Sequence, residues 1–204
     1  MKKLVKIVAA MAVALAAVVG LPQAASAEMR NVEYSCKVVA PSGPFTLDHK
    51  YVIDSTAPAT VDGGSDFLVG LDHQLIKTEP RFLHVTNLVV KIAVGGARIN
   101  DITLTGGVGL GELPPRIEWS GGIATLTIPG PVIKGGADFR MPKLTLNLSS
   151  DGRGLVTTDL AGTSYEQPGM TGRVTVPTSG GGTAELEKYC YPTSGKRLTT
   201  TLVR

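Results

Sequence analysis

Apolar and polar residues alternate along several short segments of the chain, as they do in β-strands that have one buried face. In residues 142–149, Leu144, Leu146 and Leu148 alternate with polar or charged residues. No sustained apolar recurrence at helical spacing follows residue 27. The pattern therefore predicts an all-β protein.

Glycine and proline separate these alternating segments, and the chain contains 25 Gly and 13 Pro. The regular spacing of strands and turns predicts an antiparallel β-sandwich, with a closed antiparallel barrel as the alternative. The run Leu88–Val94 is apolar on both alternating faces except at Lys91, which indicates a central strand covered on both sides. Strands are expected at residues 32–39, 45–53, 66–76, 86–94, 99–105, 124–128, 142–149, 154–160, 173–176, 183–190 and 196–203.

The first 27 residues have the three parts of a secretory signal peptide. A basic start precedes an apolar run over residues 7–20, and Ala25-Ser26-Ala27 supplies the small residues that signal peptidase requires. We expect cleavage before Glu28, which leaves residues 28–204 as a single extracellular domain. An uncleaved membrane anchor is the alternative, although the apolar run is short for a helix that spans a bilayer.

Removal of the signal peptide changes the charge of the protein. It takes Lys2, Lys3 and Lys6 from the 20 basic residues and leaves 17, which equals the 17 acidic residues. A neutral domain gives no electrostatic reason to expect binding to nucleic acid or to an anionic membrane surface. No later apolar stretch reaches the length of a transmembrane helix, so no transmembrane segment is expected after cleavage.

The two cysteines of the chain, Cys36 and Cys190, predict one disulfide, because isolated cysteine pairs are oxidised outside the cell. The alternation in residues 183–190 turns Cys190 inward together with Ala184 and Leu186. The bond is expected to join the first and last strands.

Motifs that carry catalytic or cofactor chemistry are missing from the sequence. The chain has no nucleophile elbow, zinc-protease motif or phosphate-binding loop, so no catalytic residue and no cofactor is predicted. Adjacent strand residues point to opposite faces, so Asp48-His49 and Asp72-His73 each offer one ligand to any site. No metal site is predicted, and the histidines are interpreted as solvent-facing.

Three short motifs lie near the two ends of the mature chain: Glu33-Tyr34-Ser35-Cys36, the segment Ala57-Pro58-Ala59, and Cys190 followed by Pro192. Together they resemble a family of secreted actinobacterial β-sandwich domains of unknown function. The resemblance spans most of the mature chain. It implies an exported, disulfide-linked extracellular domain and brings no catalytic residues.

A secreted or envelope-associated module without enzymatic activity fits these observations best. Its partner would be a cell-wall glycan, a lipid or a protein, and the expected contact residues are Trp119, Tyr189 and Tyr191. Strand alternation places both tyrosines on the face opposite the sulfur of Cys190. A secreted hydrolase with an unrecognised site remains an alternative. So does an exported inhibitor that presents a rigid loop over residues 165–172.

Overall fold

A computed structural model describes residues 25–131, 135–150 and 152–204, and every regular element within these residues is a β-strand. No helix in this part of the chain has the length and apolarity needed to cross a membrane. The strands are β1 (Ala25–Ala40), β2 (Gly43–Pro58), β3 (Thr60–Val61), β4 (Asp66–His73), β5 (Ile76–Lys77), β6 (His84–Gly95), β7 (Ala97–Thr105), β8 (Arg116–Ser120), β9 (Ile123–Ile128), β10 (Asp138–Phe139), β11 (Lys143–Ser150), β12 (Gly154–Leu160), β13 (Met170–Pro177), β14 (Thr183–Ser194) and β15 (Arg197–Val203).

One large mixed sheet contains 13 of these strands, and all of them except β8 and β9 follow one path in the order β3-β15-β12-β6-β13-β14-β1-β2-β4-β11-β7. Strand β9 pairs with β6, and β8 pairs with β9. Within the described residues no ladder joins β7 to β8 or to β3, so the sheet is not closed. The predicted all-β sandwich is confirmed, and the alternative of a closed barrel is wrong.

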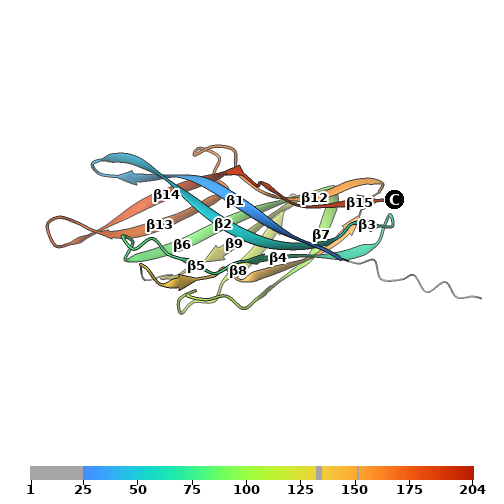
Figure 1. Cartoon of the computed structure of the whole chain (residues 1–204), viewed down its shortest axis with the longest axis horizontal. Coiled ribbons are helices and arrows are strands. Elements are labelled where there is room, and N and C mark those ends of the chain that lie inside the picture. Colours follow the sequence, from blue (N-terminus) through green and yellow to red (C-terminus); the bar gives the residue numbers. More distant parts are fainter. Residues whose placement is uncertain (1–24, 132–134, 151) are drawn as a thin grey trace, which may run out of the picture.

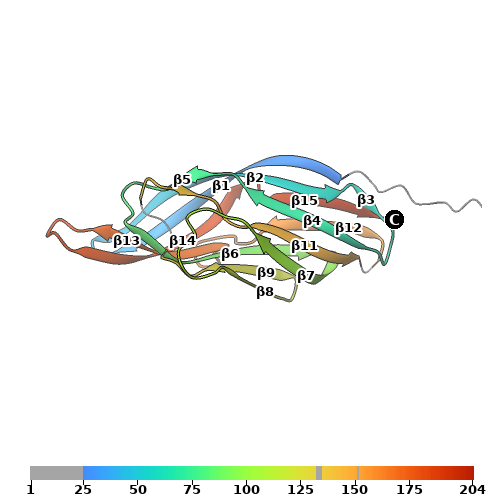
Figure 2. The ribbon, with the colours of Figure 1, turned by 90° about the horizontal axis from the view of Figure 1, so that it is seen from below.

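The sheet curls so that its two halves face each other across one core (Figures 1 and 2). Ser55 of β2 donates its hydroxyl to the carbonyl of Leu198 in β15, although these strands are not neighbours in the ladder. The three predicted core leucines of β11, Leu144, Leu146 and Leu148, are completely buried. Strand alternation therefore assigned the inward face of β11 correctly.

Strand β6 lies in the middle of the sheet, as predicted, but it is not covered on both faces. Its inward residues, such as Val90 and Ile92, are buried, whereas Val89, Lys91 and Ala93 on the outer face are half-buried. A loop, rather than a second layer of strands, lies beside this outer face. The prediction of a doubly covered strand is therefore wrong.

The disulfide between Cys36 and Cys190 is present, and both cysteines are fully buried. The two residues are directly opposite each other in the antiparallel ladder of β1 and β14. The bond therefore joins the first strand to the next-to-last strand, and not to the last one as the sequence suggested. The inward orientation predicted for Cys190 is confirmed.

Two long hairpins project together at one end of the molecule (Figures 1 and 2). They are formed by β1 with β2 and by β13 with β14. The C-terminus and the start of β1 lie at the opposite end. Residues 25–27, which precede the predicted cleavage site, pair with β2, while residues 1–24 lie outside the described part of the chain.

Candidate functional site

A cluster of tyrosines covers the outer face of the sheet opposite the disulfide. Because side chains alternate along β14, Tyr189 and Tyr191 flank the inward Cys190 and point outward, where both are half-buried. Their cross-strand neighbours on β1 are Lys37 and Ser35, respectively. The orientation predicted for the two tyrosines is confirmed, and their role in binding stays a prediction.

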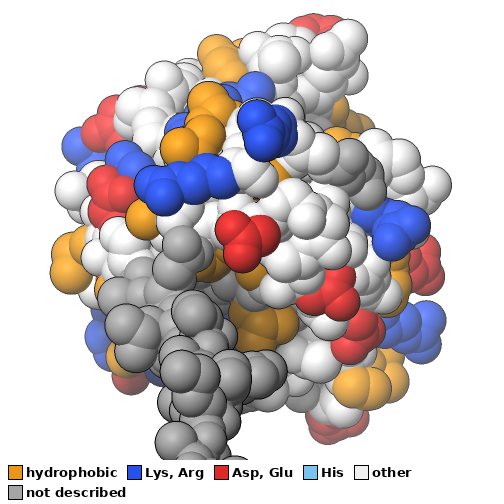
Figure 3. All heavy atoms as spheres, turned by 90° about the vertical axis from the view of Figure 1, so that its right-hand side faces the viewer, with side chains coloured by type: hydrophobic (Ala, Val, Ile, Leu, Met, Phe, Trp, Pro, Cys, Tyr) orange, Lys and Arg blue, Asp and Glu red, His pale blue; other side chains and the backbone are white. Residues whose placement is uncertain are grey.

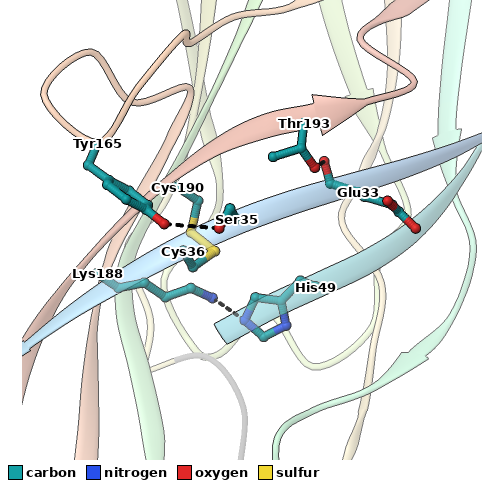
Figure 4. Close-up of a disulfide and its surroundings, with 8 residues drawn as sticks. All are labelled: Glu33, Ser35, Cys36, His49, Tyr165, Lys188, Cys190 and Thr193. Carbon is teal, nitrogen blue, oxygen red and sulfur yellow. Dashed lines mark hydrogen bonds between the residues drawn. A yellow bond between two sulfur atoms is a disulfide. The ribbon is translucent and has the colours of Figure 1, made fainter. Parts of the chain in front are cut away.

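Tyr165 completes this outer-face cluster from a different part of the chain. Its hydroxyl shares a 2.9 Å hydrogen bond with the hydroxyl of Ser35 (Figure 4). Its ring packs edge-to-face on Tyr191 with the ring centroids 5.1 Å apart, and the Lys37 ammonium lies 5.4 Å from the centre of the Tyr165 ring. Edge-to-face pairs and cation–π contacts both stabilise ring positions, so the rings of Tyr165 and Tyr191 are held in place.

The loop that carries Tyr165, residues 161–169, is held by main-chain hydrogen bonds at both of its ends. The amide of Ala161 donates to the carbonyl of Lys91, and the amide of Lys91 donates to the carbonyl of Gly169. The amide of Gly169 donates to the carbonyl of Cys190. A Cβ atom on Gly169 would collide with the carbonyl of Ala161, so the two ends of the loop can meet only because this residue is glycine.

An open groove of about 550 Å³ lies on the other side of loop 161–169, and its lining is both polar and apolar, with Ile123, Ala161 and Pro168 among the apolar residues. Its lining combines Lys91 and Thr125 from the outer face of β6 and β9 with Thr163, Glu166 and Gln167 from the loop. A hydrogen bond from Ser164 holds the pKa of Glu166 below its usual range, so this exposed carboxylate is ionised at neutral pH. The groove thus offers a cation, an anion, hydroxyls and an amide to a polar ligand.

The structure does not bring Trp119 to the tyrosine cluster. This side chain is 40% exposed on β8, and β9, β6 and β13 separate β8 from β14 in the sheet. Trp119 is directly opposite the buried Ala124 of β9, so its side chain points to the core face of the sheet. It is nevertheless exposed, because β8 is an edge strand. Its predicted role in binding would therefore concern a separate surface.

The inhibitory loop expected over residues 165–172 is shorter than predicted, because Met170 already belongs to β13. Tyr165 is packed onto the outer face of the sheet. The exposed tip is closed by two hydrogen bonds between Thr163 and Gln167, one through the backbone and one through the side chains.

The interior contains a basic pair that the sequence analysis missed. Lys188 is 6% exposed, and its Nζ atom lies 2.9 Å from Nε2 of His49, beside the disulfide (Figure 4). Burial lowers the pKa of Lys188 to about 8. Burial and, secondly, the charge of Lys188 lower the pKa of His49 to about 3, so the ammonium donates to a neutral ring. Lys188 shares the inward phase of Leu186 and Cys190 along β14, and this alternation in the sequence could have predicted that Lys188 is buried.

His49 and His73 are not solvent-facing, contrary to the interpretation of the sequence, whereas His84 is exposed as expected. His73 is 5% exposed and His49 is half-buried, because both share the inward phase of their strands. His73 has no hydrogen-bond partner at Nδ1, and burial lowers its pKa to about 4. In the described part of the chain, no three His, Cys, Asp or Glu side chains come together in a way that could hold a metal ion.

The protein belongs to the class of open β-sandwiches with one buried disulfide. Comparison with known proteins adds information about the fold alone. No model of a protein family matches the chain, and no curated protein is similar to it in sequence. A solved structure described as a putative membrane anchored protein from Corynebacterium diphtheriae is similar, with a TM-score of 0.53 and 16% sequence identity. The match covers 88% of this chain but only 38% of the other. An actinobacterial protein therefore shares this fold.

Proposed function

We propose that this protein is a non-enzymatic module of the bacterial cell envelope that binds a glycan through the outer face of its sheet. The observation that carries the proposal is the arrangement around loop 161–169, with the packed rings of Tyr165 and Tyr191 on one side and, on the other, a groove that contains polar and charged side chains. Rings of this kind offer apolar faces to a sugar, and the groove offers partners for its hydroxyl groups.

Other observations support an extracellular location. The signal-peptide pattern predicts export, and a buried disulfide is typical of oxidising compartments. The protein with a similar fold is described as membrane anchored, which is consistent with a place in the envelope.

Retention on washed cell walls tests this proposal. Replacing Tyr189 and Tyr191 by Ser should lower retention at least about tenfold, because aromatic anchors carry much of the energy of many interfaces. Glu166→Gln should weaken retention from the groove side without loosening the tyrosines. Trp119→Ser, on a separate surface, tests independently whether β8 contributes.

The thermal stability of each variant must be measured beside its retention. A Tyr189→Ser, Tyr191→Ser protein that is folded and fully retained would contradict the proposal. So would a variant whose stability falls while its retention is unchanged, since the tyrosines would then only shield the disulfide and the sheet. Turnover of a glycan by the parent protein would favour the hydrolase alternative instead.

A further inference from the structure

The two projecting hairpins share an unusual absence of charge. Residues 38–47 around the first turn and residues 174–184 around the second contain no Asp, Glu, Lys, Arg or His. Charged residues make up 18% of the whole chain, so two uncharged stretches that meet at one end set that end apart. The opposite end differs, because basic and acidic side chains are scattered over it (Figure 3).

Large apolar side chains are exposed at this uncharged end. Val39 and Phe45 of the first hairpin are 44% and 41% exposed, and Leu83 on the adjoining loop is 37% exposed. Leu83 is fixed beside the second hairpin, because its amide donates to the carbonyl of Thr175. Phe45 pairs with the inward Val38, so Val39 and Phe45 point to opposite faces of the first hairpin and expose apolar surface on both sides of its tip.

An apolar cleft of about 340 Å³ opens between the two hairpins. Phe82 is buried in it, and Arg81, whose side chain is 74% exposed, is the charged residue of the lining. The guanidinium already pairs with Glu79 at 2.8 Å, so its charge is compensated. The other lining residues come from the hairpins: Ala40, Phe45, Val176, Pro177 and Leu186.

The chemistry of the end fits a hydrocarbon layer better than a polar partner. Charged side chains are costly in the bilayer interior, and these tips have none to bury. Unpaired main-chain polar groups are also costly in lipid, but the tip of the second hairpin pairs some of its own. The amide of Gly181 donates to the carbonyl of Thr178, and the amide of Thr178 donates to the carbonyl of Gly182. The remaining turn groups favour shallow contact at the level of the headgroups and upper acyl chains.

We propose that this end of the molecule docks on a lipid bilayer, with Val39 and Phe45 among the acyl chains and the cleft between the hairpins filled by lipid hydrocarbon. The contact does not depend on lipid charge, because the tips carry none. This surface is separate from the tyrosine cluster on the outer sheet face, so the proposal does not rest on glycan binding.

Co-sedimentation of the secreted protein with phosphatidylcholine vesicles tests the docking. The parent should bind equally at low and high salt, whereas Val39→Ser combined with Phe45→Ser should bind at least about tenfold more weakly. The matched control is Leu68→Ser combined with Leu155→Ser, which removes two residues that are 60% and 59% exposed on other strands and should bind like the parent. Absence of binding by the parent, or equal loss in both double variants, would overturn the proposal.

A Phe45→Trp variant gives a readout that does not require loss of binding. Its added fluorescence should be quenched by vesicles with brominated acyl chains, while Trp119 in the parent protein should not be quenched, since it lies on β8. An unquenched Trp at position 45 in a folded protein would rule out contact with hydrocarbon. Binding only to protein-bearing membranes and not to pure lipid would instead assign this end to a protein partner, and would also overturn the proposal.

Discussion

Lys188 is a buried ammonium group, and among the described residues no carboxylate forms an ion pair with it. The adjacent His49 accepts a hydrogen bond but supplies no compensating charge. Folding therefore removes the ammonium from water without replacing its solvation in full. Such a residue destabilises the native state whenever it is protonated.

Replacing Lys188 by Met should leave the free energy of unfolding at pH 7 unchanged or raise it. The pKa of Lys188 falls from 10.5 in the unfolded chain to about 8 in the native protein, so the native state of the parent gains stability as the pH rises from 8 toward 10. The shift corresponds to roughly 3 kcal/mol over its full range. Denaturant titrations across this interval should show the rise in the parent and not in Lys188→Met. A variant much less stable than the parent at pH 7 would contradict this account.

His73 makes stability depend on acid. Its pKa is about 4 in the native protein and 6.5 in the unfolded chain, so its contribution is complete above pH 6.5 and is lost as the pH falls toward 4. His49 adds to this loss down to about pH 3. His73→Phe should reduce the slope of unfolding free energy against pH between 6.5 and 5, where the shifted carboxylates do not yet titrate. An unchanged slope would show that the pKa of His73 is not lowered in the native state.

At the scale of elements, the disulfide is a covalent constraint on how β1 and β14 pair. It fixes the register of β1 against β14 and closes a loop with a sequence separation of 154 residues. The same register places Tyr189 and Tyr191 on the outer face beside Ser35 and Lys37. Packing in the core and the arrangement of the candidate site are therefore coupled through one bond.

Replacing both cysteines by Ala should lower the free energy of unfolding by up to about 5 kcal/mol, the figure that chain entropy gives for a loop of this length. Because both cysteines are fully buried, dithiothreitol should not reduce the native protein and should reduce it readily in denaturant. Mass analysis after alkylation distinguishes the two states. Rapid reduction of the native protein would show that the β1–β14 pair opens without global unfolding.

At the scale of the whole molecule, alternation in the sequence predicted which side of a strand faces the core but not which strands are neighbours. Leu144, Leu146 and Leu148 were assigned correctly because a period of two is a local property. The position of β13 beside β6 depends on pairing between residues about 80 apart, for example Met170 with Val90, and no local pattern encodes that choice.

In the candidate site, too, the sequence predicted local orientation but not which distant segments meet. The tyrosines of β14 were found through their phase relative to Cys190, whereas Tyr165 joins them only because loop 161–169 folds back onto the sheet. Trp119 was grouped with them by residue type, and the strand order separates it from them. The cleft between the hairpins requires that two turns far apart in sequence meet at one end.

The strand order also determines when the sheet can be completed. Strand β1, the first that the structure describes, lies between β2 and β14. One of its two edges therefore stays unpaired until residue 187 and the residues after it have been synthesised. Long-range pairing of this kind slows folding, because the entropy of closing a large loop is lost before native contacts form. A chain that is synthesised from its N-terminus therefore cannot form the Cys36–Cys190 bond until nearly all of its residues are present.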